Sequence, residues 1–133
     1  MIEWLVSDYI EGNLPVVGQW FNSKSYKNNA FRKLQMRFQS KLDMIRAGGP
    51  DLLVNAIAGS SISAHIDKIQ VKGRLSISVL FCRGPKETEI TLLGASIEQD
   101  SKLTEPGLEK HAKERYSQLA TGNGRRQPYE DYP

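Results

Sequence analysis

Three strand-like segments follow one another closely in the second half of the chain, and their spacing limits the folds that are available to it. They cover residues 64–71, 75–82 and 87–93. In the middle segment every second side chain is large and apolar, as in a strand with one face against a core. The breaks between the segments, Lys72-Gly73-Arg74 and Arg83-Gly84-Pro85-Lys86, are short enough for hairpins. The sequence therefore predicts an antiparallel meander.

A long amphipathic helix is predicted over residues 23–47. Its apolar positions recur three or four residues apart and so lie on one side of a helix; they are Phe31, Leu34, Phe38, Leu42 and Ile45. Ser23 or Ser25 could cap its start, and Gly48-Gly49-Pro50 ends it. Seven basic residues and the single acid Asp43 give this segment a charge of +6, twice the +3 of the whole chain.

The remaining patterns complete a small α+β domain. Residues 2–10 predict a first strand, and short helices are predicted from Pro15 and over residues 51–58. A last helix should run from an N-cap at Thr104 to a stop at Gly122. We expect an antiparallel-rich sheet of about four strands, with N-terminal helices and a C-terminal helix packed on it. Residues 1–120 would form this domain, and residues 121–133 an exposed, flexible tail.

Composition excludes several classes of protein. A chain of 133 residues fits one domain, and no apolar run approaches the roughly 18 residues that a membrane helix needs. Cys82 is the only cysteine, which excludes an intrachain disulfide and a cysteine-based zinc site. The sequence contains no phosphate-binding glycine loop, which argues against a nucleoside-triphosphate enzyme. Because the first residues do not resemble a signal peptide, we expect a cytoplasmic protein.

Several short stretches carry more specific information. They are WLVSDY at residues 4–9 with Pro15-Val16 and Trp20-Phe21, KGRL at 72–75 leading into VLF at 79–81, EITLLGA at 89–95, and residues 102–106 followed by Glu109, Ala112 and Arg115. In this order, these stretches resemble the RelE/ParE superfamily of bacterial toxins, and most of all its phage-associated HigB-like branch. The resemblance extends over roughly residues 2–120, nearly the whole chain.

The resemblance implies a RelE-like fold and the toxin component of a type II toxin–antitoxin module. Such a toxin is a metal-independent endoribonuclease that cleaves mRNA, commonly on the ribosome, and a small antitoxin protein neutralises it. Other members of the superfamily poison DNA gyrase instead. The implied partners are therefore an antitoxin, mRNA and the ribosome, with no metal or other cofactor.

Metal-free RNA cleavage needs a group that takes the proton of the ribose 2′-OH, a group that stabilises the phosphorane-like state and a group that protonates the leaving oxygen. In the family, basic residues on the second and third strands do this work. The matching residues in this chain are Lys68, Lys72, Arg74 and Arg83. Lys68, Gln70 and Lys72 alternate and should share one face of their strand. His65 and Lys102 are further candidates for proton transfer.

Two features leave other functions open. Glu98 and Asp100 stand where many relatives carry a basic run, and they place negative charge beside the proposed phosphate site. This favours a non-catalytic protein of the same fold, such as a gyrase-directed toxin or a phage accessory protein. The basic helix predicts RNA contacts through Lys33, Arg37 and Lys41. A solvated charged face and a generic nucleic-acid-binding domain remain alternatives.

Overall fold

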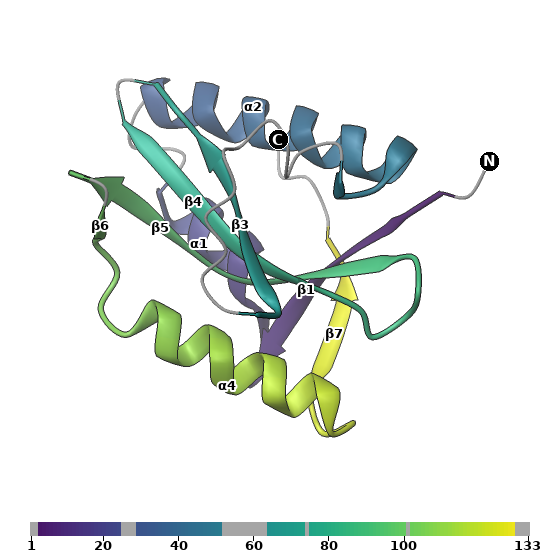
Figure 1. Cartoon of the computed structure of the whole chain (residues 1–133). Helices are drawn as coiled ribbons and strands as arrows, with labels where there is room; N and C mark the ends of the chain where they lie inside the picture. Colours follow the sequence, from purple (N-terminus) through teal and green to yellow (C-terminus); the bar gives the residue numbers. More distant parts are fainter. Residues whose placement is uncertain (1–2, 25–28, 52–63, 74, 101, 130–133) are drawn as a thin grey trace.

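The computed structural model describes residues 3–24, 29–51, 64–73, 75–100 and 102–129. Its elements follow in the order β1 (Leu5–Glu11), β2 (Leu14–Pro15), α1 (Val16–Lys24), α2 (Asn29–Gly48), β3 (Ile66–Val71), β4 (Ser76–Arg83), β5 (Glu89–Gln99), β6 (Lys102–Leu103), α4 (Leu108–Ala120) and β7 (Arg125–Pro128) (Figure 1). They form a small α+β domain, in which helices pack on a mixed, mostly antiparallel sheet. The fold class predicted from the sequence is confirmed at this level.

The sheet has the strand order β2-β1-β5-β4-β3, with β6 paired to β5 and β7 paired to β1. Strands β3, β4 and β5 form the predicted antiparallel meander. Strand β1 lies parallel to β5, from Leu5 beside Glu89 to Asp8 beside Leu92. The sheet is larger than the sequence predicts, and β5 continues to Gln99, well beyond residue 93.

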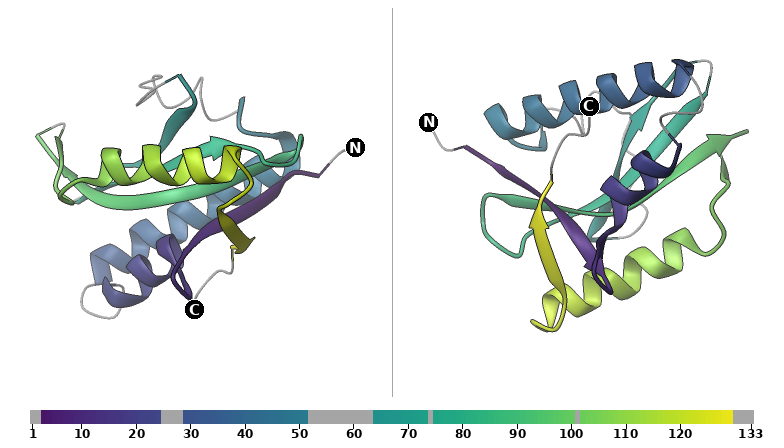
Figure 2. Two further views of the ribbon diagram at one scale, coloured as in Figure 1. Left: turned by 90° about the horizontal axis from the view of Figure 1, so that it is seen from below. Right: turned by 180° about the vertical axis from the view of Figure 1, so that it is seen from behind.

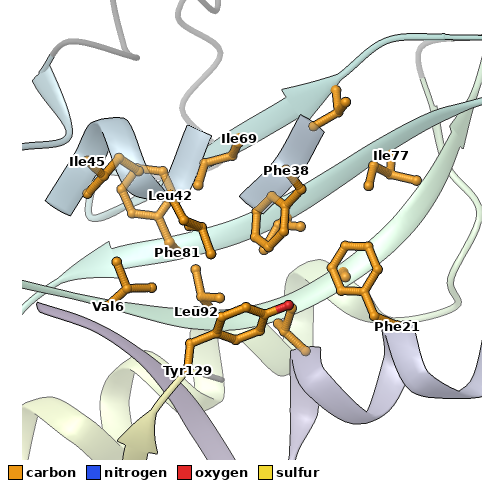
Figure 3. Close-up of a cluster of buried hydrophobic side chains, with 14 of the residues drawn as sticks. Val6, Phe21, Phe38, Leu42, Ile45, Ile69, Ile77, Phe81, Leu92 and Tyr129 are labelled. Carbon is orange, nitrogen blue, oxygen red and sulfur yellow. The ribbon is translucent and has the colours of Figure 1, made fainter. Parts of the chain in front are cut away.

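Helices cover both faces of the sheet, with α1 and α2 on one face and α4 on the other (Figure 2). Because successive strand side chains point to opposite faces, the sheet carries two cores. The larger core lies between the sheet and the helices α1 and α2 and includes Phe21, Phe38, Leu42, Ile69 and Phe81 (Figure 3). The smaller core lies under α4 and includes Tyr9, Leu80, Leu93, Leu108 and Leu119.

Helix α4 approaches β5 closely because Gly94 has no side chain. A β-carbon at Gly94 would lie 2.4 Å from Leu108 Cδ1. Arg115 of α4 donates from Nη1 to the main-chain oxygen of Leu93 at 2.6 Å and from Nε to Glu11 at 3.1 Å. These bonds tie α4 to β5 and to the end of β1.

Two helix boundaries differ from those predicted. Helix α2 begins at Asn29 rather than at residue 23, because Ser23 belongs to α1, where its hydroxyl donates to the main-chain oxygen of Trp20. Helix α4 begins at Leu108. Thr104 does not cap α4, because its amide and hydroxyl both donate to the main-chain oxygen of Ile97 on β5. The predicted cap Ser25 and residues 52–58 of the predicted short helix lie outside the described residues.

The segment predicted to be an exposed tail contributes a strand, which corrects that prediction. Strand β7 pairs antiparallel with β1, and Tyr129 is buried with its ring edge-on to Phe38. Arg126 donates to both carboxylate oxygens of Glu89, at 2.6 and 2.9 Å. Tertiary contacts of this kind, rather than local sequence propensity, place residues 125–129 in the fold.

Asp8 fixes the start of α1 from the middle of the sheet. Its side chain is buried and accepts hydrogen bonds from the amides of Val17, at 2.9 Å, and Gly18, at 2.7 Å. These amides belong to the first turn of the helix, which has no intrahelical acceptor for them. Burial raises the pKa of Asp8 to about 6, although these two hydrogen bonds and the charge of Arg115 favour the ionised form. The native state therefore holds the Asp8 proton more tightly than the unfolded chain does.

Replacing Asp8 by asparagine should change how the stability depends on pH. In the wild type, Asp8 ionises in the unfolded chain before it ionises in the native state, so its contribution to stability falls as the pH rises from about 4 to 6. A pKa raised from 3.8 to about 6 corresponds to a loss of about 3 kcal/mol across this window. Asp8→Asn keeps a hydrogen-bond acceptor and cannot ionise. Urea unfolding at pH 4, 5, 6 and 7.5 measures the free energy of unfolding. Relative to the wild type, Asp8→Asn should lose less of this free energy as the pH rises from 4 to 6.

The control is Asp43→Asn, because Asp43 is an exposed carboxylate on α2 that pairs with Arg46. This variant should follow the wild-type pH dependence. Equal slopes for Asp8→Asn and the wild type between pH 4 and 6 would contradict the proposed role of Asp8.

Candidate functional site

A hydrogen bond joins the basic helix α2 to the β3–β4 hairpin. Arg37 of α2 donates from Nη1 to the main-chain oxygen of Lys72, which follows β3, at 2.8 Å. The sequence placed Arg37 among the RNA-binding residues and Lys72 among the catalytic ones. The structure brings one member of each predicted set together at this point. We call Lys33, Arg37, Lys41 and Lys72 the basic surface.

The helical repeat and a glycine shape the basic surface. Lys33, Arg37 and Lys41 are spaced by four residues and lie on one side of α2. Gly73 lies directly against the helix, because a β-carbon there would be 2.9 Å from Leu34 Cδ2 and 3.4 Å from Arg37 Nη1. Lys33, Arg37 and Gly73 line a hollow between the helix and the hairpin. Lys33 and Arg37 place two positive charges beside main-chain groups at this hollow, an arrangement that can bind a phosphate group.

A second polar group surrounds Glu98 on the face of the sheet that carries α4. Lys68 Nζ donates to Glu98 Oε1 at 2.8 Å, and the Gln70 amide donates to Glu98 Oε2. Ser78 Oγ donates to the same Oε2 at 3.3 Å. The prediction that Lys68 and Gln70 share a strand face is confirmed, and the negative charge predicted from Glu98 lies directly beside Lys68. We call these four residues the Glu98 cluster.

The Glu98 carboxylate is buried but remains ionised. Burial alone would raise its pKa, but the hydrogen bonds and charge of Lys68, with the bonds from Gln70 and Ser78, hold the pKa below its usual value. A carboxylate with a lowered pKa is a weaker base than a free one. The pairing also neutralises Lys68, which reduces what this lysine could contribute to holding a phosphate.

The Glu98 cluster opens into a hollow at the start of α4. Lys68, Glu98, Lys102 and Lys110 line this hollow with Glu105 and Glu109. Three lysines and three glutamates cancel in formal charge. The hollow is therefore less suited to an anion than the basic surface, although Lys102 is exposed and close enough to share it with Lys68.

The other predicted catalytic residues do not join these groups. Arg83 lies at the far end of β4, where it pairs with Asp51. His65 precedes β3 at the same end, and its ring stacks on Tyr116 with centroids 5.0 Å apart. Six residues of nearly extended chain lie between His65 and Lys72, so the two residues are roughly 20 Å apart. His65 and Arg83 therefore do not share a catalytic centre with Lys72. Arg74 lies outside the described residues.

The sequence analysis did not predict one residue of the site, Ser78, and one contact, the bond from Arg37 to the main-chain oxygen of Lys72. Ser78 faces Glu98 because it pairs with Gln70 across β3 and β4 and so shares the face of Lys68. The alternation of side chains along β4 is enough to predict the face on which Ser78 lies. The bond from Arg37 to the Lys72 oxygen had no local signal, because it depends on how α2 lies against the sheet.

Comparison with protein-family models, with curated proteins and with solved structures finds no match to this chain. Within the described ranges, the side chains include no group of three or more His, Cys, Asp or Glu residues that could hold a metal ion. Cys82 is buried, and burial raises the pKa of its thiol to about 12. No helix of the described part of the chain is long and apolar enough to cross a membrane.

Proposed function

We propose that this protein is a RelE-like toxin of the HigB-like branch, which binds mRNA through the basic surface and cleaves it. The observation that carries the proposal is the hydrogen bond from Arg37 to Lys72, because it joins helix residues and hairpin residues that were predicted separately. Together they offer several cations to one stretch of phosphate backbone. The order of the elements, a strand, two helices, a three-stranded meander and a helix, supports the RelE-like part of the proposal.

The chemistry of cleavage would take place where the hairpin meets the Glu98 cluster. Gln70 belongs to this cluster and is two residues before Lys72, which is about 7 Å along a strand. The Glu98 carboxylate would accept the 2′-OH proton as the 2′ oxygen attacks phosphorus. Lys68 or Lys102 would give a proton to the leaving 5′ oxygen, and Lys72 would stabilise the charge on the phosphorus oxygens. Arg37, which reaches Lys72 from the α2 side of the sheet, would hold a neighbouring phosphate of the RNA. These steps need no group beyond the residues of the chain.

The same Glu98 cluster favours a second function. Because Lys68 is already paired with Glu98, and because the pKa of Glu98 is lowered, both groups can be purely structural. The protein would then be a non-catalytic binding protein of the same fold, either a gyrase-directed toxin or a phage accessory protein. It would inhibit growth without cutting RNA, or would not inhibit growth.

Induced expression in a bacterial host, with growth and RNA 5′ ends followed together, tests the proposal. New 5′ ends inside translated messages as growth stops support an mRNA-cleaving toxin. Growth arrest with intact RNA supports the gyrase-directed alternative. Unchanged growth and unchanged RNA contradict the toxin proposal.

Glu98→Gln separates the two functions in purified protein. Glutamine retains an acceptor for Lys68 but cannot take a proton, so a catalytic Glu98 predicts a fall in cleavage rate of roughly 100-fold or more with unchanged RNA affinity. Cleavage of a labelled mRNA fragment, with and without ribosomes, measures the rate. Asp100→Asn is the control, because Asp100 is exposed in the turn after β5 and should leave the rate unchanged. An equal rate for Glu98→Gln and the wild type would remove Glu98 from the reaction.

The outer face of α2 is the surface that we expect an antitoxin to cover. Met36 and Met44 are 67% and 49% exposed there, and the cations of the basic surface lie beside them. An acidic, amphipathic antitoxin helix would bury both methionines and pair with those cations. Met36→Ser with Met44→Ser removes the apolar contacts and adds no charge to the basic surface. This variant should therefore escape neutralisation by the antitoxin, measured as loss of growth rescue when the two proteins are expressed together, while toxicity persists. Rescue that survives both changes would place the antitoxin elsewhere.

A further inference from the structure

One stretch of β5 has a neighbouring strand on only one side. On the edge away from β4, the pairs with β1 end at Leu92, and the pairs with β6 begin at Glu98. Among the described residues, no strand covers this edge between those two points. Arg115 and Thr104 reach it and donate to the main-chain oxygens of Leu93 and Ile97. The Arg115 side chain and the main chain at Thr104 therefore occupy part of the β5 edge, where a neighbouring strand would otherwise pair.

Ala95 lies in the middle of this uncovered stretch. The main-chain oxygen of Ile97 points to the outer edge, because it accepts from the Thr104 amide there. Main-chain groups alternate in direction along a strand, so the N–H and C=O of Ala95, two residues earlier, point to the same edge. Buried main-chain groups are nearly always paired, and Ala95 is buried. Its N–H and C=O are the donor and acceptor that an added strand would use.

A groove runs along this edge between α1 and α4, which lie on opposite sides of β5 (Figure 2). Its apolar wall includes Trp20, Leu108 and Leu14, and Leu14 is 53% exposed. Glu11 and Glu105 also line the groove, and Glu114 extends it along α4. The cation Arg115 already donates to Glu11 and to the main chain. The groove therefore combines an apolar wall, an open strand edge and an excess of carboxylates.

We propose that this groove binds an extended peptide segment of a partner protein by strand addition to β5. The peptide would exchange two main-chain hydrogen bonds with Ala95. An apolar side chain would lie against Leu14 and Trp20, and a lysine or arginine two positions away, on the same side of the strand, would face Glu11 or Glu105. The carboxylates disfavour a nucleic acid, whose phosphates need cations. The groove residues are distinct from the basic surface, so the inference does not depend on the proposed function.

Two pools of capped pentapeptides test the proposal by NMR of the 15N-labelled protein. Both pools carry leucine at the second position and small residues elsewhere; the fourth position is lysine or arginine in the basic pool and aspartate or glutamate in the acidic pool. The signals to follow are the Ala95 amide and the Trp20 indole. Trp4, the other of the two tryptophans in the chain, lies beside Gly49 and is the internal control. We expect the basic pool to shift the Ala95 and Trp20 signals, to bind at least tenfold more tightly than the acidic pool, and to slow exchange of the Ala95 amide at least tenfold.

Leu14→Gln should weaken binding of the basic pool at least tenfold. Its matched control is Leu5→Gln, because Leu5 is also an exposed leucine, 49% exposed, at the other end of β1 from the groove. Both variants can be checked for folding by their amide spectra. The Lys33→Glu/Lys72→Glu variant should bind the basic pool like the wild type, which separates this test from that of RNA binding.

The proposal is overturned if neither pool shifts the Ala95 amide, or if the acidic pool binds as tightly as the basic one. It is also overturned if Leu14→Gln and Leu5→Gln bind equally. An RNA oligonucleotide that shifts Ala95 as strongly as the basic pool would assign the groove to nucleic acid instead.

Discussion

Replacing Lys33 and Lys72 together by glutamate should lower the affinity of the protein for single-stranded RNA by roughly 100-fold. One residue comes from α2 and the other from the β3–β4 hairpin, and both are exposed. A hydrogen bond to a charged group contributes about 1.5 kcal/mol or more, close to tenfold in affinity. The variant also places a carboxylate one helical turn before Arg37, where it can pair with that guanidinium. The affinity should become less dependent on salt, with a slope smaller by about one to two.

Substitution of the Lys33 and Lys72 side chains should leave the fold intact. Arg37 donates to the main-chain oxygen of Lys72, and a change of side chain at residue 72 keeps that oxygen. Fluorescence anisotropy with a labelled oligonucleotide at three salt concentrations measures both the affinity and the slope. Growth after induction reports on toxicity, which should be lost with the affinity.

A control with the same change in net charge distinguishes a local contact from general electrostatic attraction. Lys86 follows β4 and Lys113 lies on α4, and both are exposed. Lys86→Glu/Lys113→Glu should reduce RNA affinity much less than the test variant, since long-range charge effects are screened beyond about 8 Å at physiological salt. If both variants lose affinity equally, the basic surface is not the RNA-binding site.

The elements with strong periodicity could be predicted from the sequence. The interval of three or four residues from Phe31 to Ile45 marks the buried side of α2, and alternation marks β4. Lys68 and Gln70 were placed on one strand face for the same reason, and both contact Glu98. Local periodicity is sufficient where one side of an element faces a core.

The features that depend on distant partners could not be predicted in this way. The parallel pairing of β1 with β5 joins segments more than 80 residues apart. Residues 125–128 are mostly polar and lack strand periodicity, and they become β7 because β1 offers an edge and Glu89 attracts Arg126. The bond from Arg37 to Lys72 likewise follows from the packing of α2 on the sheet. The sequence therefore indicates which residues can form a site better than it indicates which of them meet.

Removing the Arg126 side chain should destabilise the protein more than any other single truncation on β7. Glu89 is buried, and burial alone would raise its pKa, but the bonds from Arg126, the Ser7 hydroxyl and the Lys86 amide hold the pKa below its usual value. Arg126→Ala leaves this carboxylate buried without its cation. We expect a loss of about 3–5 kcal/mol in the free energy of unfolding at pH 7, measured by urea denaturation.

The pH dependence and two further variants show whether the pairing with Glu89 causes this loss. In the wild type, a Glu89 pKa below its ordinary value stabilises the fold above pH 4.5, and this contribution is lost as the pH falls through the native pKa. Without Arg126 the native pKa rises, because desolvation is no longer opposed by the guanidinium. The difference in free energy of unfolding between Arg126→Ala and the wild type should therefore become smaller from pH 7 to pH 4.

Arg125→Ala is the control, because Arg125 is a neighbouring β7 arginine that, among its described contacts, bonds only to the exposed Gly12 carbonyl. This variant should lower the free energy of unfolding by about 1 kcal/mol or less. Glu89→Gln/Arg126→Ala should be more stable than Arg126→Ala alone, since it removes the buried charge. A double variant as unstable as Arg126→Ala would mean that lost packing, and not the unpaired carboxylate, causes the effect.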